Sequence, residues 1–259
     1  MLRAESVSFG YDEGFTLNDV SVTIPAGSLT GLLGPNGSGK TTLLKLLSGV
    51  LRPQTGRVML GNRALTSMTR RELARHVASV PQETHPAFDY SVMEMVLMGR
   101  HPHLSAFQLE GPADFGIARD ALDATGTRYL ADRKYMTLSG GEKQRVVIAS
   151  ALAQSTEVLL LDEPTASLDL RYQLDVASLL ARLNRERKVT MVLATHDLNL
   201  AASLCERLIV MRGGRILTAG PTREVLTGDT VRQLYDVEAD VQFHEAAGHV
   251  TVIPVRRMP

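Results

Sequence analysis

The stretch Gly34-Pro35-Asn36-Gly37-Ser38-Gly39-Lys40-Thr41-Thr42 decides the fold, because it is a loop of the Gly-x-x-x-x-Gly-Lys-Ser/Thr type. It follows the apolar run 29–33, which predicts a buried strand, and leads into residues 41–47, whose apolar spacing predicts a helix. Backbone N–H groups of such a loop and of the helix start attract phosphate. We therefore predict a nucleotide site that these residues line, with Lys40 on the β- and γ-phosphates and the Thr41 hydroxyl on Mg²⁺.

Composition excludes several other classes of protein. The chain has 259 residues, enough for one large domain or two small ones. Its 28 Lys and Arg balance 28 Asp and Glu without a basic stripe, so nucleic acid is not favoured as a partner. No apolar run has the length of a membrane span, and residues 1–5 do not begin a signal peptide. The single cysteine, Cys205, excludes an internal disulfide and fits a reducing compartment; a packed helix residue is expected there, with a catalytic thiol less favoured.

Strand and helix patterns alternate along the chain, as in an α/β domain. Residues 87–152 are helix-rich, and we interpret them as a helical subdomain inserted into the α/β core. Residues 241–255 alternate weakly and are expected to add a terminal strand pair. The other expected strands are 6–9, 20–24, 56–62, 77–81, 158–162, 189–194, 208–211 and 215–219, and the other expected helices are 68–76, 91–100, 113–125 and 143–153.

Residues 158–163 form an apolar strand that ends in two carboxylates. Asp162 at the strand end is suited to hold Mg²⁺ through water. Glu163, one residue further, is suited to polarise a water for attack on the γ-phosphorus. Two adjacent acids also fit a solvated strand end, but their position after a phosphate-binding loop favours the catalytic interpretation.

Residues 138–145, Leu-Ser-Gly-Gly-Glu-Lys-Gln-Arg, precede the expected helix 143–153. Ser139 and Glu142 have the spacing of a capping box, which is an ordinary helix start. The Gly140-Gly141 start is also a second anion site. The chain thus offers two helix starts suited to phosphate.

These segments together resemble the ATP-binding subunit of an ABC transporter, whose signature sequence is that of residues 138–145. The resemblance covers roughly residues 1–235. It extends to Tyr11 as the adenine-stacking aromatic residue, Gln82 as the Q-loop glutamine, Ser167-Leu168-Asp169 as the D-loop, and His196 as the switch histidine.

The fold implied by the resemblance is a P-loop NTPase core with a mixed sheet, an antiparallel β subdomain and an inserted helical signature subdomain. It implies an ABC ATPase domain over residues 1–240 and a short C-terminal extension over 241–259.

The chemistry implied is ATP hydrolysis in a head-to-tail homodimer. Residues Ser139, Gly140, Gly141 and Glu142 of one subunit would close over the γ-phosphate held by Lys40 of the other. The catalytic residues implied are Glu163, His196 and Gln82; the Mg²⁺ ligands implied are Thr41, Gln82 and Asp162; and Asp169 would lie near the dimer seam.

Residues 91–104, 168–173 and 196–201 resemble importers of iron–siderophores, haem and cobalamin. This implies a bacterial or archaeal importer with a two-subunit permease, served indirectly by a periplasmic or lipoprotein substrate-binding protein. The subunit would be peripheral, at the cytoplasmic face of the inner membrane. His101 and His103 are interpreted as residues near the permease contact rather than metal ligands, because no third ligand is near in sequence.

Three alternatives remain open from the sequence. The chain could serve another ABC transporter, or be a soluble ABC ATPase of DNA repair or translation, although neither a second cassette nor a long coiled-coil insertion is visible. It could also be a nucleotide-gated clamp without hydrolysis, against which Glu163 and His196 argue.

Overall fold

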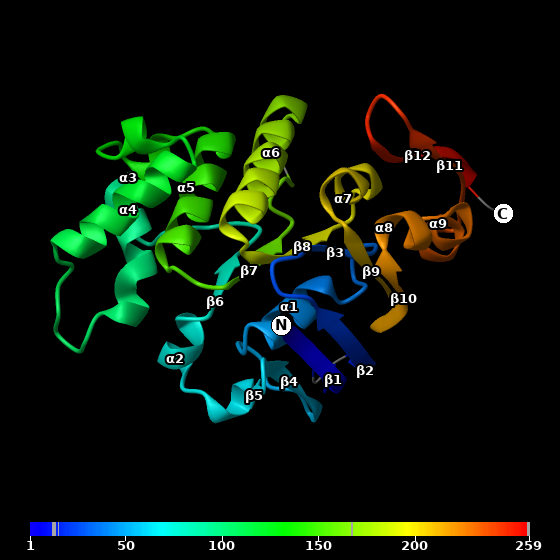
Figure 1. Ribbon diagram of the computed structural model, residues 1–259, viewed down its shortest axis with the longest axis horizontal. Coiled ribbons are helices and arrows are strands. Elements are labelled where there is room, and N and C mark those ends of the chain that lie inside the picture. The colour runs from blue at the N-terminus through cyan, green and yellow to red at the C-terminus, as the bar shows by residue number, and fades with distance from the viewer. Residues whose placement is uncertain (12–13, 15, 167, 258–259) are drawn as a thin grey trace. The chain divides into compact units, whose positions relative to one another are not determined.

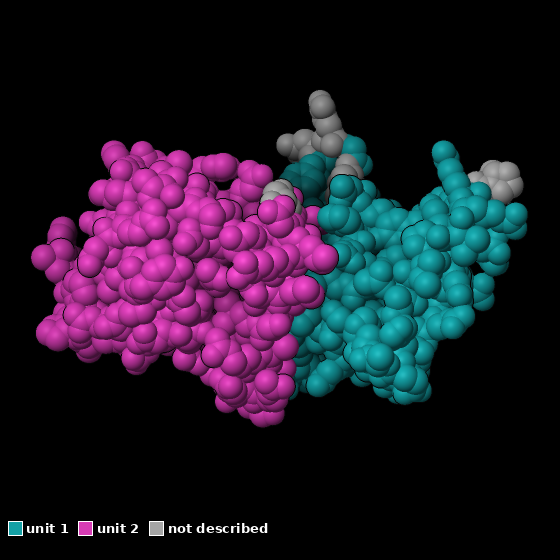
Figure 2. Space-filling model, turned by 90° about the horizontal axis from the view of Figure 1, so that it is seen from above, with its two compact units in different colours: residues 1–68, 190–259 teal, residues 69–189 magenta. Residues whose placement is uncertain are grey.

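The computed structural model describes residues 1–11, 14, 16–166 and 168–257. Ser167, the first residue of the expected D-loop, lies outside the described residues. The chain forms two compact units, shown in different colours in Figure 2: residues 1–68 with 190–259, here unit 1, and residues 69–189, here unit 2. The expected boundaries of the helical insertion, 87–152, stay a prediction, as do those of the 1–240 domain and the 241–259 extension.

Unit 1 contains a four-stranded sheet in the order β2-β1-β4-β5, in which every pair of strands is antiparallel (Figure 1). Burial alternates along β2, as expected for a sheet with one face against a core. This is the antiparallel β subdomain that the resemblance implied. Its strands are β1 (Leu2–Gly10), β2 (Thr16–Ile24), β4 (Thr55–Leu60) and β5 (Arg63–Ala64).

Unit 1 also contributes four strands in the order β10-β9-β3-β8 to a mixed sheet. Strand β3 (Leu29–Leu33) pairs in parallel with β8 (Thr190–Thr195) and β9 (Arg207–Arg212), and β9 turns back into antiparallel β10 (Arg215–Pro221). Every residue of β3 and β8 is buried, which explains their continuous apolar runs. The α/β class and the mixed sheet of the prediction are confirmed.

The helices of unit 1 and its last strand pair complete that unit. The expected pair at 241–255 is confirmed as an antiparallel hairpin, but it begins earlier. Cys205 is buried directly after α7 rather than inside it, and burial raises the pKa of its thiol, so it is a packing residue. The elements are α1 (Lys40–Leu47), η1 (Leu65–Ser67), α7 (Leu198–Leu204), α8 (Thr222–Val225), α9 (Gly228–Tyr235), β11 (Val237–His244) and β12 (His249–Arg257).

Unit 2 combines two parallel strands with a helical cluster (Figure 1). Strands β6 (Val77–Val80) and β7 (Val158–Asp162) pair, and helices α3, α4 and α5 pack on one another. The expected helix 91–100 is α3 followed by a 3₁₀ segment. The helical elements are α2 (Arg70–Ala74), α3 (Val92–Leu97), η2 (Met98–His103), α4 (Pro112–Ala124), η3 (Arg128–Leu130), η4 (Tyr135–Thr137), α5 (Gly140–Ala153) and α6 (Leu170–Arg187).

A buried ion pair joins η2 to α4 inside the helical cluster. Arg100 Nε donates to Asp114 Oδ1 at 3.0 Å, and Arg100 Nη1 donates to the carbonyl of Ala153 at the end of α5 at 2.7 Å. A hydrogen bond from the Gly111 N–H, and next the Arg100 guanidinium, lower the pKa of Asp114 below its usual 3.8. One arginine therefore ties together three segments that are distant in sequence.

Replacing Asp114 by alanine should lower the free energy of unfolding by ~3 kcal/mol, because it leaves the Arg100 charge buried without its partner. The native pair should also be acid-sensitive. Since the folded-state pKa is depressed, its stabilisation is complete above the ordinary value of 3.8 and disappears as the pH falls through the lowered pKa. Chemical denaturation at neutral and acidic pH measures both effects.

Asp123→Ala is the matched control, because Asp123 pairs with Arg128 at 2.9 Å on the surface. Its loss should change stability by less than ~1 kcal/mol. Equal destabilisation by the two substitutions would contradict the importance of the buried pair.

Candidate nucleotide-binding site

The glycine-rich loop lies in unit 1 between β3 and α1, in the predicted order of strand, loop and helix. Gly39 is the N-cap of α1 with φ of 105°, a left-handed conformation that favours glycine. Gly34 is closely covered: a Cβ there would lie 2.3 Å from the carbonyl oxygen of Met211 in β9 and 2.6 Å from Ser38 Oγ. Two of the glycines are therefore required by backbone conformation and by space.

The interior of the loop is polar and suited to an anion. The side chain of Lys40 is buried, and its Nζ donates to the carbonyls of Gly34 at 2.9 Å and Pro35 at 3.2 Å. Ser38 Oγ is also buried, and it has no hydrogen-bond partner within the described residues. No described side chain caps the N-terminus of α1. Its amides, the lysine and the unpaired hydroxyl fit a phosphate group.

The structure brings the loop and His196 to the same edge of a sheet. Strands β3 and β8 are parallel neighbours, and their last residues, Leu33 and Thr195, are paired in register. The loop follows one strand and the exposed His196 follows the other. The next residue, Asp197, caps α7 by accepting hydrogen bonds from the N–H groups of Asn199 and Leu200. The segment with His196 is thus short and anchored at both ends.

A parallel arrangement places Gln82 and Asp162 at one sheet edge of unit 2. Val80 of β6 is paired in register with Leu161 of β7, so Gln82 and Asp162 both lie just beyond this pair. Gln82 is exposed, whereas Asp162 is half-buried. Their oxygen atoms, and the exposed Thr41 hydroxyl in unit 1, are of the hard donor type that Mg²⁺ prefers.

The described part of the chain contains no group of three His, Cys, Asp or Glu side chains placed to hold a metal ion. Mg²⁺ is usually bound by one or two protein side chains together with phosphate oxygens and water, so this finding is compatible with such a site. His101 instead faces Glu110, with Nε2 3.6 Å from Oε1, and His103 Nε2 contacts the carbonyl of Gln154 at 2.8 Å.

Glu163 has an unusual backbone. Its φ is +46°, in the left-handed region that non-glycine residues seldom occupy. Its carbonyl accepts a hydrogen bond from Ala166 at 3.0 Å, so a tight turn fixes this conformation directly after β7. Strain of this kind costs ~1–3 kcal/mol and concentrates at functional sites, which supports the interpretation of this carboxylate as more than a solvated strand end.

The capping box at the start of α5 is confirmed. Ser139 N and Oγ donate to Glu142 Oε2 at 2.9 and 2.8 Å, and Glu142 N donates back to Ser139 Oγ at 3.4 Å. The backbone hydrogen bond from Ser139 is the main cause of a lowered pKa at Glu142. Gly141 lies against Tyr172, where a Cβ would be 2.5 Å from the ring. Ser139 and Gly140 are exposed, so this helix start is open to a further partner.

The remaining predicted site residues also lie at the surface. Tyr11 is 43% exposed and packs edge-on against Phe9, with ring centroids 5.0 Å apart. Asp169 is the exposed N-cap residue of α6. Unit 1 therefore carries Tyr11, the glycine-rich loop and His196, and unit 2 carries the other predicted residues: Gln82, Ser139, Gly140, Gly141, Glu142, Asp162, Glu163 and Asp169.

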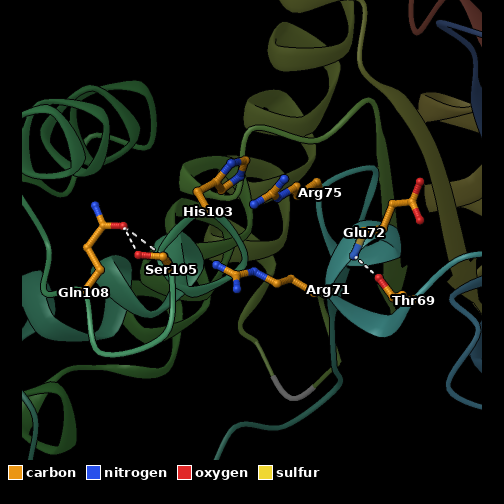
Figure 3. A pocket seen from close by; sticks show the side chains of 7 residues that line it. All are labelled: Thr69, Arg71, Glu72, Arg75, His103, Ser105 and Gln108. Carbon is orange, nitrogen blue, oxygen red and sulfur yellow. Dashed lines mark hydrogen bonds between the residues drawn. The ribbon is translucent and has the colours of Figure 1, made fainter.

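A polar groove in unit 2 was not predicted from the sequence. It has a volume of about 560 Å³ and is lined by residues of α2 and its two caps, by the end of η2 and by the segment that follows η2. Arg71 and Arg75 both donate through Nε to the carbonyl of Pro102, at 3.1 and 2.8 Å. Figure 3 shows their guanidinium groups pointing toward His103 and Ser105. In the sequence, the only indication of this groove was the spacing of Arg71 and Arg75, which places them one helical turn apart on the same face.

Comparison with known proteins places the chain in a family. The sequence profile described as "ABC transporter" matches residues 17–166, more than half of the chain. The chain therefore belongs to the ABC transporter family. It is an ATPase of that family, in which ATP is used together with Mg²⁺.

Relatives and solved structures agree with this assignment. The iron(3+)-hydroxamate import ATP-binding protein FhuC of Bacillus subtilis is 40% identical over 93% of this chain and 89% of its own. A transporter assigned to the metal-chelate type, in an inward-facing conformation, contains a similar chain with a TM-score of 0.87 and 30% identity, covering 98% of this chain and 96% of that one.

The dimeric structure of a bacterial ABC transporter cassette matches with a TM-score of 0.74 and 29% identity, over 86% of this chain and 99% of that one. ATP-binding subunits of importers dimerise and work with a separate permease. Within the described residues, none of the helices combines the length and the apolar character that a membrane span requires.

Proposed function

We propose that this chain is the ATP-hydrolysing subunit of a bacterial or archaeal importer for a metal chelate: an iron–siderophore, cobalamin or haem. The observation that carries the proposal is the 40% identity to an iron(3+)-hydroxamate import subunit over nearly the whole chain. The likeness to a solved transporter of the metal-chelate type supports the same class of cargo.

The geometry of the glycine-rich loop supports the nucleotide roles that we propose. Residues 34–42 would hold the phosphates, with Lys40 exchanging a carbonyl contact for a phosphate oxygen. Tyr11 would stack on adenine. Bound Mg²⁺ would neutralise phosphate charge, and Thr41, Gln82 and Asp162 are the residues proposed to hold it.

Hydrolysis requires a base that activates water and a group that contacts the γ-phosphate. Glu163 is proposed as the base that polarises the attacking water, because its carboxylate follows the Asp162 strand end in a fixed turn. His196 is proposed to contact the γ-phosphate, because it follows the strand paired with the one before the loop. Gln82, at the corresponding edge of unit 2, completes the proposed catalytic set.

The exposed helix start at Ser139 is proposed to act on the nucleotide of a second copy of the chain. Ser139, Gly140, Gly141 and Glu142 would close over that γ-phosphate, with Asp169 near the seam. Loss of the γ-phosphate would then open the dimer. The solved dimeric cassette of similar fold supports this arrangement.

A permease of two membrane-spanning subunits is the proposed partner of residues 83–104. His103 lines the polar groove of unit 2. The two arginines of the same lining outnumber its one carboxylate, Glu72, which suits a permease segment that carries acidic side chains. The chain would then sit peripherally at the cytoplasmic face of the inner membrane. A periplasmic or lipoprotein substrate-binding protein would deliver the chelate from the other side.

Gln82→Ala should lower transport about fivefold or more while the affinity for ATP changes much less. The substitution weakens the coupling between the nucleotide site and the permease, but it leaves the phosphate loop intact. His103→Ala should weaken assembly with the permease and leave hydrolysis by the isolated subunit unchanged. Transport and ATPase activity are measured on the same reconstituted complex.

His76→Ala is the control, since this half-buried histidine pairs with Glu157 and lies outside residues 82–104. It should leave transport and assembly at the wild-type level. If transport and hydrolysis fall in strict proportion for every change within 82–104, the segment belongs to the catalytic site and its coupling role is wrong.

The proposed cargo class is tested with the complex purified through a tag on this chain and reconstituted in proteoliposomes. ATP-dependent uptake of ferric hydroxamate, cobalamin or haem is the expected result. Uptake of none of the three, with ATPase activity intact, would instead favour another ABC transporter. Absence of any membrane protein from the purified complex would favour a soluble ABC ATPase.

A further inference from the structure

The C-terminal hairpin is bonded to the helix that follows His196. Asn199, in the first turn of α7, donates through Nδ2 to the carbonyl of Val252 at 3.2 Å and accepts from the Val252 N–H at 2.8 Å. One side chain thereby satisfies both backbone groups of a single β12 residue. Strand β12 also packs along α7. Both elements belong to unit 1.

A second contact reaches His196 itself. The hydroxyl of Tyr235, the last residue of α9, donates to the carbonyl oxygen of His196 at 3.0 Å. This hydrogen bond fixes the peptide plane that follows the histidine. The proposed γ-phosphate contact therefore has its backbone held by a residue that is 39 positions away in sequence.

Helix α9 is in turn bonded to the end of β9, a strand that contacts the phosphate loop. Arg212, at the end of β9, forms an ion pair with Asp236, Nη2 to Oδ2 at 2.7 Å, and also donates to the carbonyl of Gln233. The same strand end supports the phosphate loop through two contacts. The carbonyl of Met211, the residue before Arg212, lies against Gly34. Just after β9, the Gly214 N–H donates to the carbonyl of Ser38 at 3.1 Å. Tyr235 is therefore anchored to the strand end that supports the loop.

We propose that the C-terminal segment 228–257 sets the position of His196 for hydrolysis, with Tyr235 and Asn199 as positioning residues. This rests on the γ-phosphate role proposed above for His196. The side chain of His196 is exposed, and its main-chain carbonyl accepts the hydrogen bond from Tyr235. A reacting group must be held within ~0.5 Å of its working geometry, and here the surrounding hydrogen bonds supply that restraint.

The first test is Tyr235→Phe in the full chain assembled with its permease. It removes one hydroxyl and keeps the ring, so kcat should fall about three- to tenfold, the range of one lost hydrogen bond, while KM for ATP stays within about twofold. Asn199→Ala should behave in the same way through α7. Because misfolded protein would lower the apparent kcat without changing KM, kcat is calculated from the fraction of protein that binds a fluorescent ATP analogue, and a lower kcat of that fraction separates positioning from misfolding.

Gln242→Ala is the matched control. Gln242 belongs to the same hairpin, is exposed, and bonds to Asp240 at 2.8 Å within β11. Its loss should leave kcat unchanged. A decrease equal to that of Asn199→Ala would show general sensitivity of the hairpin and overturn the specific assignment.

A double substitution decides whether the effect passes through His196. If Tyr235 acts by holding His196, then Tyr235→Phe should cause no further loss of kcat in a His196→Ala background. Two outcomes would overturn the positioning proposal and leave the role of His196 intact. The first is that the losses of kcat from Tyr235→Phe and His196→Ala add up. The second is that Tyr235→Phe and Asn199→Ala both keep a normal kcat while His196→Ala is impaired. Normal kcat in His196→Ala would overturn the assigned role of His196 and, with it, this proposal.

Discussion

Glu163→Gln is expected to bind ATP and to lose hydrolysis. The amide keeps the size of the side chain and the turn after β7, in which Glu163 has a φ of +46°, but it cannot take a proton from water. A missing general base lowers kcat by about 10²- to 10⁴-fold. Phosphate release at saturating ATP measures kcat, and equilibrium binding of a fluorescent ATP analogue measures affinity.

Two comparisons make this result specific. Glu157→Gln changes an exposed carboxylate at the other end of β7, where it pairs with His76 at 2.9 Å, and it should retain full activity. Lys40→Ala should instead lower the affinity for ATP, because it removes the cation from the phosphate loop. If Glu163→Gln turns over ATP at a near-normal rate, Glu163 is not the base.

The second large effect concerns assembly. Glu163→Gln protein should dimerise with ATP and remain monomeric with ADP, because the γ-phosphate is the proposed bridge between subunits. Adding Ser139→Arg should abolish this dimer, since it places bulk at the exposed start of α5. Sedimentation with each nucleotide gives the mass directly. A monomer with ATP, also in the presence of the permease, would remove the head-to-tail model.

Ser91→Arg controls for the loss of a helix cap. Ser91 forms the same capping box with Glu94 at the start of α3 as Ser139 forms with Glu142. Each replacement removes a cap worth ~1 kcal/mol, so the two should destabilise the chain similarly. Only the Ser139 variant should fail to dimerise. Equal loss of the dimer in both variants would trace the effect to stability.

Local patterns predicted much of the fold. The loop at 34–42, strands β3 and β7, and the capping box of Ser139 depend on residues close together in sequence, and all four are confirmed as local structure. The roles of the predicted site residues stay predictions, although the paired ends of β3 and β8 bring the loop and His196 to one edge.

What the sequence left out depends on contacts between distant residues. The pairing of Arg100 with Asp114 and the bond from Tyr235 to His196 leave no periodic signal, because each joins separate elements. Helices α6 and α9 were not predicted at all. The left-handed backbone of Glu163 was also missed, because a turn after a strand, rather than residue type, imposes it.

The burial of Cys205 has a practical consequence for spectroscopy. It is the single cysteine of the chain, it is 4% exposed, and its thiol is held in the neutral, unreactive form. Maleimide dyes and spin labels react with exposed thiolates, so the natural sequence serves as its own unreactive background. One cysteine placed at an exposed position such as Gln242 would then carry a single probe, and the hairpin could be followed through the ATPase cycle without further engineering.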